Sequence, residues 1–366
     1  MSIKRVIASI TMLTLSATLF FGCGQSTQKE SNSTDSTATT TTSEEAASAS
    51  STVKENDQVY VYKFAHSMAE STPRHQSMLY FKEEVEKRTS GRIKVELYPN
   101  GTMGSEAELM DMVKVNAIQG TCGSQFEKAN PQYLIYNMPF MFNTAEEFQA
   151  ILDSEFEKQL AKGAIKNGYY IPATGIAGGY RQITNNKRPI ETPADLEGLK
   201  LRTPPLAPII KTMAALKANP TQISYNETYM ALKTGVADGQ ENPPSNIVEK
   251  KFYEVQKYMS IINYMICPEC FFTNNNWYES LPADLQKTFN EVATEAMKLR
   301  TDTWLSSEDA NIKIISEHCT VNEVSQENIE AFRKLCTPVW QEFVTQGSYS
   351  QSDLDTLLAE LGKNRK

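Results

Sequence analysis

The sequence of 366 residues is poor in histidine, with only His66, His75 and His318. It also lacks a G-x-S-x-G nucleophile elbow, a P-loop and an H-E-x-x-H zinc signature. The common patterns of hydrolases, nucleotide-binding proteins and metalloproteases are therefore absent. Nothing in the sequence calls for an enzyme, and we expect no catalytic residue, cofactor or metal.

Cysteine is also scarce, and the six cysteines include one C-x-x-C pair, Cys267 and Cys270. No second C-x-x-C or H-x-H pair supplies the two further ligands that a zinc site needs. The flanking residues are apolar and strand-like, whereas a thioredoxin-like pair begins a helix. We interpret these cysteines as structural or incidental, and a local disulfide is the alternative.

Basic residues are outnumbered, with 36 Lys and Arg against 44 Asp and Glu, a net charge of −8. Removing residues 1–23 takes away Lys4 and Arg5 and no acid, which leaves 34 − 44 = −10. A phosphate backbone would be repelled, so we exclude nucleic acid as a partner. A small anion is not excluded, because the local charge of a pocket can oppose the overall charge.

The N-terminus has the pattern of a secretory signal. Lys4 and Arg5 precede an apolar run over 6–21 that ends at Gly22 and Cys23. The ending L-F-F-G-C is similar to a bacterial lipoprotein signal, in which the cysteine becomes the lipidated first residue. We predict a lipoprotein signal peptide over 1–23 with lipidation at Cys23. The alternatives are an uncleaved anchor helix, or cleavage elsewhere with Cys23 unmodified.

Residues 24–56 are rich in Ser, Thr and Ala and contain no aromatic residue. Such a segment cannot build a core, so we predict a disordered tether. A lipid anchor and a tether would hold the folded part at the outer face of the cell membrane. About 310 residues follow, which is enough for about two domains.

The folded part begins with alternating strand and helix patterns. Residues 59–66 and 91–98 alternate with the period of two that is typical of strands, and helical spacing follows each of them over 76–87 and 106–116. This order predicts parallel α/β units.

The same pattern returns in the second half. A short alternating strand over 199–202 precedes a helix that Pro204 and Pro205 open. Asn226 is a suitable N-cap for the next helix. From 283 to about 318 the sequence predicts one unusually long helix, long enough to cross two lobes.

Three central stretches resemble one family: G-G-Y-R-Q-I-T (178–184), P-A-D-L-E-G-L-K-L-R (193–202) and E-T-Y-M-A-L-K-T-G-V-A-D-G-Q-E-N-P (227–243). The family is that of the dicarboxylate-binding (DctP) type solute-binding proteins of TRAP transporters, which are tripartite ATP-independent uptake systems. The resemblance covers essentially everything after the tether.

The resemblance implies a two-lobed, periplasmic-binding-protein-like α/β fold of the class II type, with a long helix spanning both lobes. By the family pattern, lobe I would hold 57–179 plus 268–310. Lobe II would hold 180–267 plus 311–366. It also implies membrane permease subunits as partners, and we expect a monomer.

The resemblance assigns the ligand carboxylate to Arg202, which ends the G-L-K-L-R strand. The position is also chemically suitable, because α/β proteins place ligands at strand ends and a guanidinium gives a carboxylate two parallel hydrogen bonds. A surface arginine paired with Asp195 or Glu197 is the alternative. Arg181 matches a second ligand-contacting arginine, and Asn242 matches the asparagine of D-G-Q-E-N.

Four further residues are candidates for the binding site. Tyr225 falls where the family often places an aromatic wall. His66 at a strand end, Glu70 in the following loop and Gln125 after a short strand could bond ligand hydroxyls, or could be structural. We expect Glu241 to hold a turn together, with a minor possibility of metal binding.

Two arginines and an amide indicate a ligand with at least one carboxylate. The other polar candidates favour a sugar acid such as a hexuronate. A C4-dicarboxylate, which would want a second cation in the opposite lobe, or a keto acid is the alternative. From other classes, a sensory ligand-binding module or a secreted cysteine-dependent enzyme remains open.

Overall fold

A computed structural model describes residues 58–364 of the chain. The predicted signal peptide, Cys23 and the predicted tether lie outside the described residues. Within this part of the chain, no helix combines the length and the apolar character needed to cross a bilayer.

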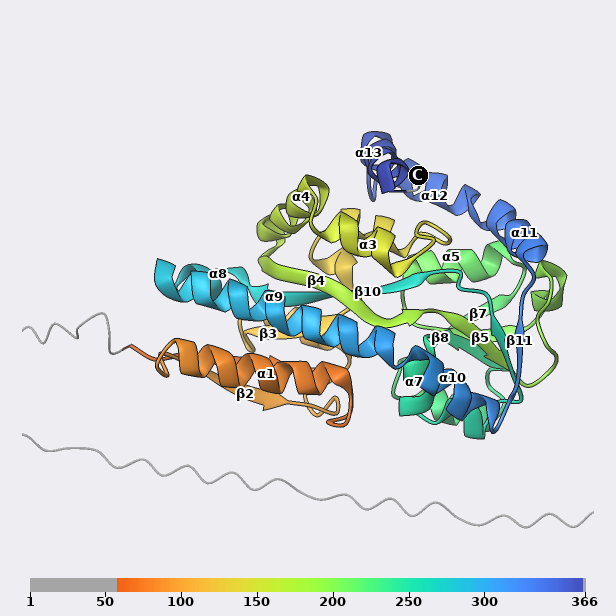
Figure 1. Cartoon of the computed structure of the whole chain (residues 1–366), viewed down its shortest axis with the longest axis horizontal. Coiled ribbons are helices and arrows are strands. Elements are labelled where there is room, and N and C mark those ends of the chain that lie inside the picture. The colour runs from red at the N-terminus through yellow and green to blue at the C-terminus, as the bar shows by residue number, and fades with distance from the viewer. Residues whose placement is uncertain (1–57, 365–366) are drawn as a thin grey trace, which may run out of the picture. The chain divides into compact units, whose positions relative to one another are not determined.

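Two mixed β-sheets form the framework of the described part (Figure 1). In the first sheet the strand order is β2 (Ile93–Tyr98), β1 (Tyr60–Ala65), β3 (Gly120–Gly123), β10 (Ile266–Asn274) and β4 (Tyr169–Tyr180). In the second it is β11 (Thr320–Glu323), β9 (Tyr258–Ile261), β5 (Gln182–Asn185), β8 (Gly239–Asn242), β6 (Lys200–Thr203) and β7 (Asn219–Gln222).

The strand directions confirm the predicted parallel units only in part. Strand β1 runs parallel to β2, from Tyr60 opposite Ile93 to Ala65 opposite Tyr98, and β6 runs parallel to β7 and β8. Strands β5 and β10 instead run antiparallel to their neighbours. Each of these two enters its sheet directly from a strand of the other sheet, without the helix that a parallel connection requires.

The chain crosses between the sheets at closely spaced points. Strand β4 ends at Tyr180 and β5 begins at Gln182, so Arg181 alone separates them. A second crossover, over 262–265, joins β9 to β10. The backbone N–H of Arg181 donates to the carbonyl of Met265 at 2.8 Å, which ties the two crossovers together.

Helices cover both sheets. In chain order they are α1 (Pro73–Arg88), α2 (Glu106–Lys114), α3 (Ala145–Leu152), α4 (Glu155–Ala164), α5 (Ala207–Ala215), α6 (Thr228–Lys233), α7 (Pro244–Glu249), α8 (Asn275–Glu279), α9 (Ala283–Ser306), α10 (Glu308–Ser316), α11 (Gln326–Cys336), α12 (Pro338–Thr345) and α13 (Gln351–Asn364). Helix α9 packs on β4 and α1, α10 packs on α7, and α13 packs on α3.

The predicted single helix over 283–318 is wrong in one respect, because it divides at Ser307 into α9 and α10. The Ser307 hydroxyl donates to the carbonyl of Trp304 at 2.8 Å, and hydroxyls that bond to helix carbonyls in this way bend helices. The break is therefore local, and the chain continues from the first sheet to the second as a bent pair of helices. A smaller difference concerns Asn226: α6 begins at Thr228 with Glu227 as its N-cap.

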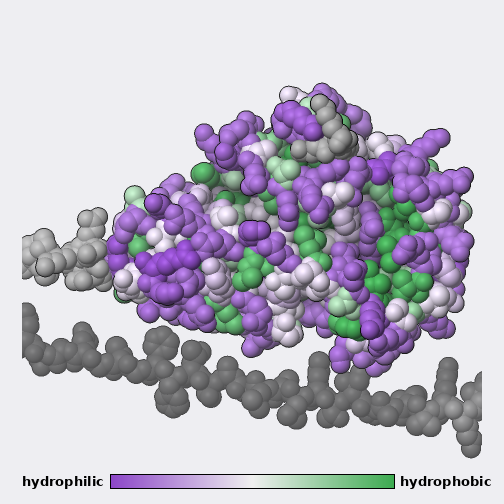
Figure 2. Space-filling view, viewed as in Figure 1, coloured by the Kyte–Doolittle hydropathy of each residue, from purple (hydrophilic) through white to green (hydrophobic). Residues whose placement is uncertain are grey.

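A groove of about 780 Å³ lies along the crossovers. Its walls include Tyr180 and Gln182 on either side of Arg181, Ile262 in the second crossover, and Ser306 and Glu308 at the helix break. In Figure 2 hydrophobic residues gather on the part of this face that carries the second sheet, at the right. Because the crossover segments line this groove, a rotation of one sheet against the other would change its width.

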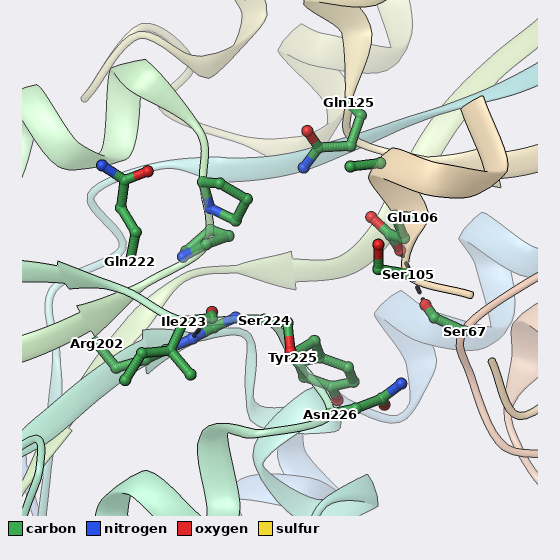
Figure 3. Close-up of a pocket in the computed structure, with 13 residues that line it drawn as sticks. Ser67, Ser105, Glu106, Gln125, Arg202, Gln222, Ile223, Ser224, Tyr225 and Asn226 are labelled. Atoms are coloured by element: carbon green, nitrogen blue, oxygen red, sulfur yellow. Dashed lines mark hydrogen bonds between the residues drawn. The ribbon is translucent and has the colours of Figure 1, made fainter. Parts of the chain in front are cut away.

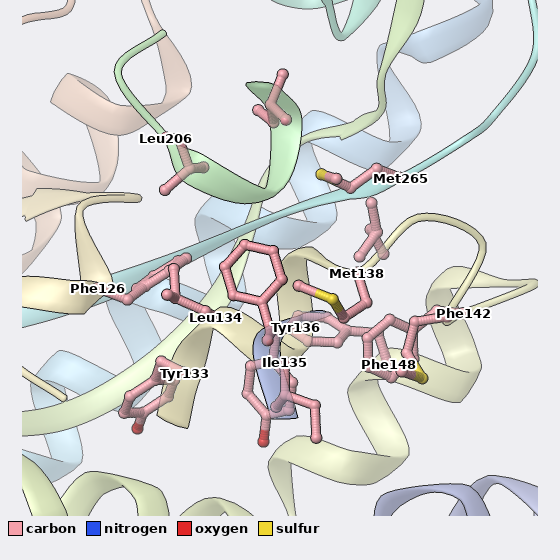
Figure 4. Close-up of a cluster of buried hydrophobic side chains, with 14 of the residues drawn as sticks. Phe126, Tyr133, Leu134, Ile135, Tyr136, Met138, Phe142, Phe148, Leu206 and Met265 are labelled. Atoms are coloured by element: carbon pink, nitrogen blue, oxygen red, sulfur yellow. The ribbon is translucent and has the colours of Figure 1, made fainter. Parts of the chain in front are cut away.

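A large cluster of buried hydrophobic side chains, many of them aromatic, packs against both sheets (Figure 4). Tyr133 and Tyr136 turn their hydroxyls the same way, and both donate to the carboxyl of Glu157, at 2.8 and 2.7 Å. Thr174 donates to the same group at 2.6 Å. Burial raises the pKa of Glu157 to about 7, although the three hydroxyls oppose the shift.

Candidate functional site

Two adjoining cavities, of about 160 and 70 Å³, bring together residues that follow strands of the two sheets. Figure 3 shows the larger one, with Ser67, Ser105, Glu106 and Gln125 on one side and Arg202, Ile223, Ser224, Tyr225 and Asn226 on the other. The two cavities share the residues Glu106, Gln125, Arg202, Pro204 and Tyr225.

Arg202 is a buried guanidinium that forms no ion pair with any described residue. Its neighbour Leu201 is buried in the core, so the strand alternation turns Arg202 toward the cavities. Its Nε donates to the carbonyl of Ile223 at 2.8 Å. Burial lowers the pKa of Arg202 to about 10, and the charges of Glu241 and Glu106 oppose that shift. A buried cation in this state is suited to an anionic ligand.

Arg181 differs, because a carboxylate of the protein already engages its guanidinium. Its Nε and Nη2 both donate to Glu241, the latter at 2.9 Å, and Nη1 lies 3.2 Å from the sulfur of Cys267. Burial acts to lower the pKa of Arg181, but the charge of Glu241 prevails and raises it well above the usual value. The Tyr264 hydroxyl also donates to Glu241. Arg181 lines the smaller cavity as one half of a neutral pair.

Asn242 ends β8 and also lines the smaller cavity. Its Oδ1 accepts from Arg181 at 3.4 Å and from Asn246 at 3.1 Å. The stretch that leads to it depends on Gly239, where a Cβ would lie 2.2 Å from the carbonyl oxygen of Thr184 in β5. Only glycine allows this close approach, which brings Asn242 into register opposite Gln182, next to Arg181.

Tyr225 and Gln125 line both cavities. The Tyr225 hydroxyl donates to Glu249 at 2.6 Å, which leaves the ring as its exposed surface toward the cavities. No hydrogen bond joins the Gln125 side chain to another described residue, so its amide is available to a ligand.

The structure does not bring His66 and Glu70 to these cavities. His66 is fully buried, with its Nε2 3.1 Å from Nδ1 of His75, and burial lowers its pKa to about 2. Glu70 is exposed and accepts a hydrogen bond from Asn100 at 3.3 Å.

Sequence reasoning missed several lining residues, above all Glu106. The signal was present: Ser105 and Glu108 form a capping box, which places Glu106 in the first turn of α2. A glutamate in that turn is usually explained by its favourable interaction with the helix dipole, so the sequence gives no reason to expect it in a cavity wall.

The five cysteines after Cys23 are buried and unpaired by disulfides in the structure. Over the described residues, no group of three or more His, Cys, Asp or Glu is arranged to hold a metal. Glu241, the weak metal candidate, is used by Arg181 and Tyr264.

Comparisons with known proteins bear on this geometry. The family described as bacterial extracellular solute-binding protein, family 7 (DctP), matches residues 64–346. The C4-dicarboxylate-binding protein DctB of Bacillus subtilis is 29% identical over 299 residues, which cover 78% of this chain and 83% of that protein.

Two solved TRAP periplasmic solute-binding proteins are similar in fold. One, from Shewanella oneidensis with bound succinate, has a TM-score of 0.78 and 26% identity and covers 83% of this chain and 99% of its own. The other, from Roseobacter denitrificans with bound β-D-glucuronate, has a TM-score of 0.77 and 26% identity and covers 82% and 98%. These similarities confirm the two-lobed α/β fold and the resemblance seen in the sequence.

Proposed function

Because the chain belongs to the bacterial extracellular solute-binding proteins of family 7, we propose that it captures its organic acid in the cavities around Arg202. Proteins of this kind serve TRAP transporters, bind small organic acids outside the cytoplasm and work with membrane permease components; they are not enzymes.

The observation that carries the proposed site is the unpaired, buried guanidinium of Arg202. A ligand carboxylate would supply the missing charge and two hydrogen bonds. Asn242, Gln125, Tyr225 and Arg181 line the same space. His66 and Glu70 line neither cavity, which favours the structural role that is the alternative for both residues.

Arg202→Ala tests the site. Truncating one partner of a buried, hydrogen-bonded charge pair costs about 2–5 kcal/mol, so we expect affinity to fall at least about thirtyfold. Isothermal titration with D-glucuronate and with succinate measures the loss. Arg188→Ala is the control, because Arg188 is exposed, bonds to two backbone carbonyls and lines neither cavity. Near wild-type affinity in Arg202→Ala would remove Arg202 from the site.

For the ligand, we favour a sugar acid such as a hexuronate. Support comes from the polar side chains around Arg202 and from the neighbour that holds glucuronate. A C4-dicarboxylate is the second candidate, because one neighbour holds succinate and the B. subtilis relative is a C4-dicarboxylate-binding protein.

We further propose that lipidated Cys23 anchors the chain to the outer face of the cell membrane and that the protein is a monomer. The support for the anchor is the L-F-F-G-C ending of residues 19–23. The intact mass of the protein from native membranes tests the anchor, and an unmodified Cys23 would contradict it.

A further inference from the structure

The wall opposite Arg202 carries a carboxylate, that of Glu106. Glu106 lines both cavities, and its side chain is about a quarter exposed (26%). In Figure 3 it lies across the open space from Arg202, beside Ser105 and Ser67. A ligand held by Arg202 therefore extends toward a negative group.

Glu106 is held in a fixed position through one of its two oxygens. Its Oε1 accepts from Arg74 Nη1 at 2.9 Å and from the Ser67 hydroxyl at 3.2 Å. Its Oε2 lies against the backbone of Gly123, where an added Cβ would be 3.0 Å away. No hydrogen bond reaches Oε2 from the described residues, so this oxygen can accept one from a ligand.

The arginine behind Glu106 has no charge to spare for a ligand. Arg74 Nε also lies 2.7 Å from Oε1 of the fully buried Glu269, whose Oε2 is 3.5 Å from Arg300. Two arginines and two glutamates therefore form a cluster with a formal charge of zero. Its only member carboxylate that reaches the cavities is Glu106.

The pairing of the arginines that line the cavities also favours a ligand with a single carboxylate. Three arginines line the cavities: Arg74 pairs with Glu106 and Glu269, Arg181 pairs with Glu241, and only Arg202 lacks a carboxylate partner among the described residues. One free cation matches one ligand carboxylate. A second carboxylate would meet the carboxylate of Glu106, and the described residues offer it no cation that is not already paired with a carboxylate of the protein.

We infer that Glu106 is the specificity-determining residue of the site: it accepts a hydrogen bond from a hydroxyl of a polyhydroxy monocarboxylic acid and rejects dicarboxylates. This inference rests on the proposed function and adds to it the residue that makes the choice. A ligand without a hydroxyl at this place would leave the Glu106 acceptor unpaired. A site built to hydrogen-bond a ligand hydroxyl strongly rejects analogues that lack it.

The test compares the affinities of D-glucuronate and D-galactonate with those of succinate and fumarate in the wild type, Glu106→Gln and Asp111→Asn. Asp111 lies on the same helix, pairs with Lys128 and lines neither cavity, so its variant removes an equal charge without touching the site. Each protein is freed of bound ligand by unfolding and refolding, and its fold is checked by circular dichroism.

We expect the wild type and Asp111→Asn to bind a sugar acid at least tenfold more tightly than either dicarboxylate. In Glu106→Gln that ratio should fall at least tenfold, because the sugar acid loses its charged acceptor and the dicarboxylate loses its repulsion. If Glu106→Gln does not fold, Glu106→Asp replaces it: the charge stays, so rejection of succinate should persist while sugar-acid affinity falls.

A wild type that prefers succinate, or an unchanged ratio in folded Glu106→Gln, would overturn the inference. Capture of an organic acid at Arg202 would stand in both cases, and a preference for succinate would favour the second ligand candidate. If Glu106→Asp, used as the replacement, keeps full sugar-acid affinity, it also overturns the inference. If the wild type binds none of the four acids, the inference is overturned. A wider screen of acids with the wild type and Arg202→Ala then decides whether the proposed function fails as well.

Discussion

Two buried arginines, Arg181 and Arg202, line the candidate site, and their partners within the protein differ. Arg181 donates to the carboxylate of Glu241, which also accepts from the Tyr264 hydroxyl. These bonds hold the Arg181 side chain in place at the crossover. Arg202 bonds one backbone carbonyl and no carboxylate of the described chain. The unpaired arginine is therefore the one that gains most from an anionic ligand.

The sequence predicts some residues of the candidate site and misses others, for physical reasons. The motif G-L-K-L-R marks Arg202, because strand alternation determines where its side chain points. The pairing of Arg181 with Glu241 joins residues 60 positions apart, and no local pattern records it. Glu106 was missed because a glutamate in the first turn of a helix already has a local explanation, and its salt bridge with Arg74 is likewise a tertiary contact.

Glu157 gives a prediction about pH. Its pKa is raised by burial to about 7 in the folded state, against 4.5 for the ordinary group. The unfolded chain then loses its proton at lower pH than the folded one, so stability falls as pH rises from about 4.5 to 7, by up to about 3 kcal/mol. Thermal unfolding at pH 5 and pH 7.5 should show a lower melting temperature at the higher pH.

The matched variants separate Glu157 from other groups. Glu157→Gln should flatten this dependence, whereas Glu155→Gln, at an exposed position on the same helix, should keep it. Burial also raises the pKa of Glu308 to about 7, so some dependence will remain in Glu157→Gln. An equal slope in both variants would mean that Glu157 does not carry the effect.

At the scale of elements, the first helices and strands of the described chain follow the local pattern closely. The strand predicted over 91–98 is β2, and the helix predicted over 76–87 is α1, which begins at Pro73 and ends at Arg88. The antiparallel course of β5 and β10 was not predictable in this way. It depends on where the chain leaves one sheet for the other, and a single residue, Arg181, makes one of those changes.

Helix α7 also joins the two walls of the site. Glu249 at its end accepts the backbone N–H of Ala69, from the loop after β1, at 3.2 Å, and the Tyr225 hydroxyl at 2.6 Å. Ala69 follows a strand of the first sheet, while α7 follows a strand of the second. This carboxylate therefore bridges the two halves beside the cavities.

We expect Glu249→Ala to speed ligand release. The lost hydrogen bonds to a charged acceptor are worth about 1.5–3 kcal/mol, so the dissociation rate should rise at least about tenfold. Stopped-flow displacement measures it, with Glu254→Ala as the control, because Glu254 bonds Tyr229 at an exposed position away from the cavities. An unchanged dissociation rate in Glu249→Ala would show that the bridge does not hold the halves together.

At the scale of the whole molecule, the fold consists of two sheets joined by crossovers, with the candidate site between the residues that follow their strands. The division into lobes of 57–179 plus 268–310 and 180–267 plus 311–366 remains a prediction. Helix α13, which this prediction places in lobe II, packs on α3, which it places in lobe I. The C-terminal helix therefore returns to a helix from the first half of the sequence. Local sequence patterns do not reveal such long-range packing.

The most direct test of the central claim is thermal unfolding of the ligand-free protein with a panel of hexuronates, aldonates, C4-dicarboxylates, keto acids and amino acids. A ligand at a hundredfold excess over its dissociation constant adds about 2.7 kcal/mol, which raises the melting temperature by a few degrees. We predict a rise for a single class of carboxylic acid, and its loss in Arg202→Ala. No rise with any of these acids in correctly folded protein would contradict a carboxylate-binding role for this chain.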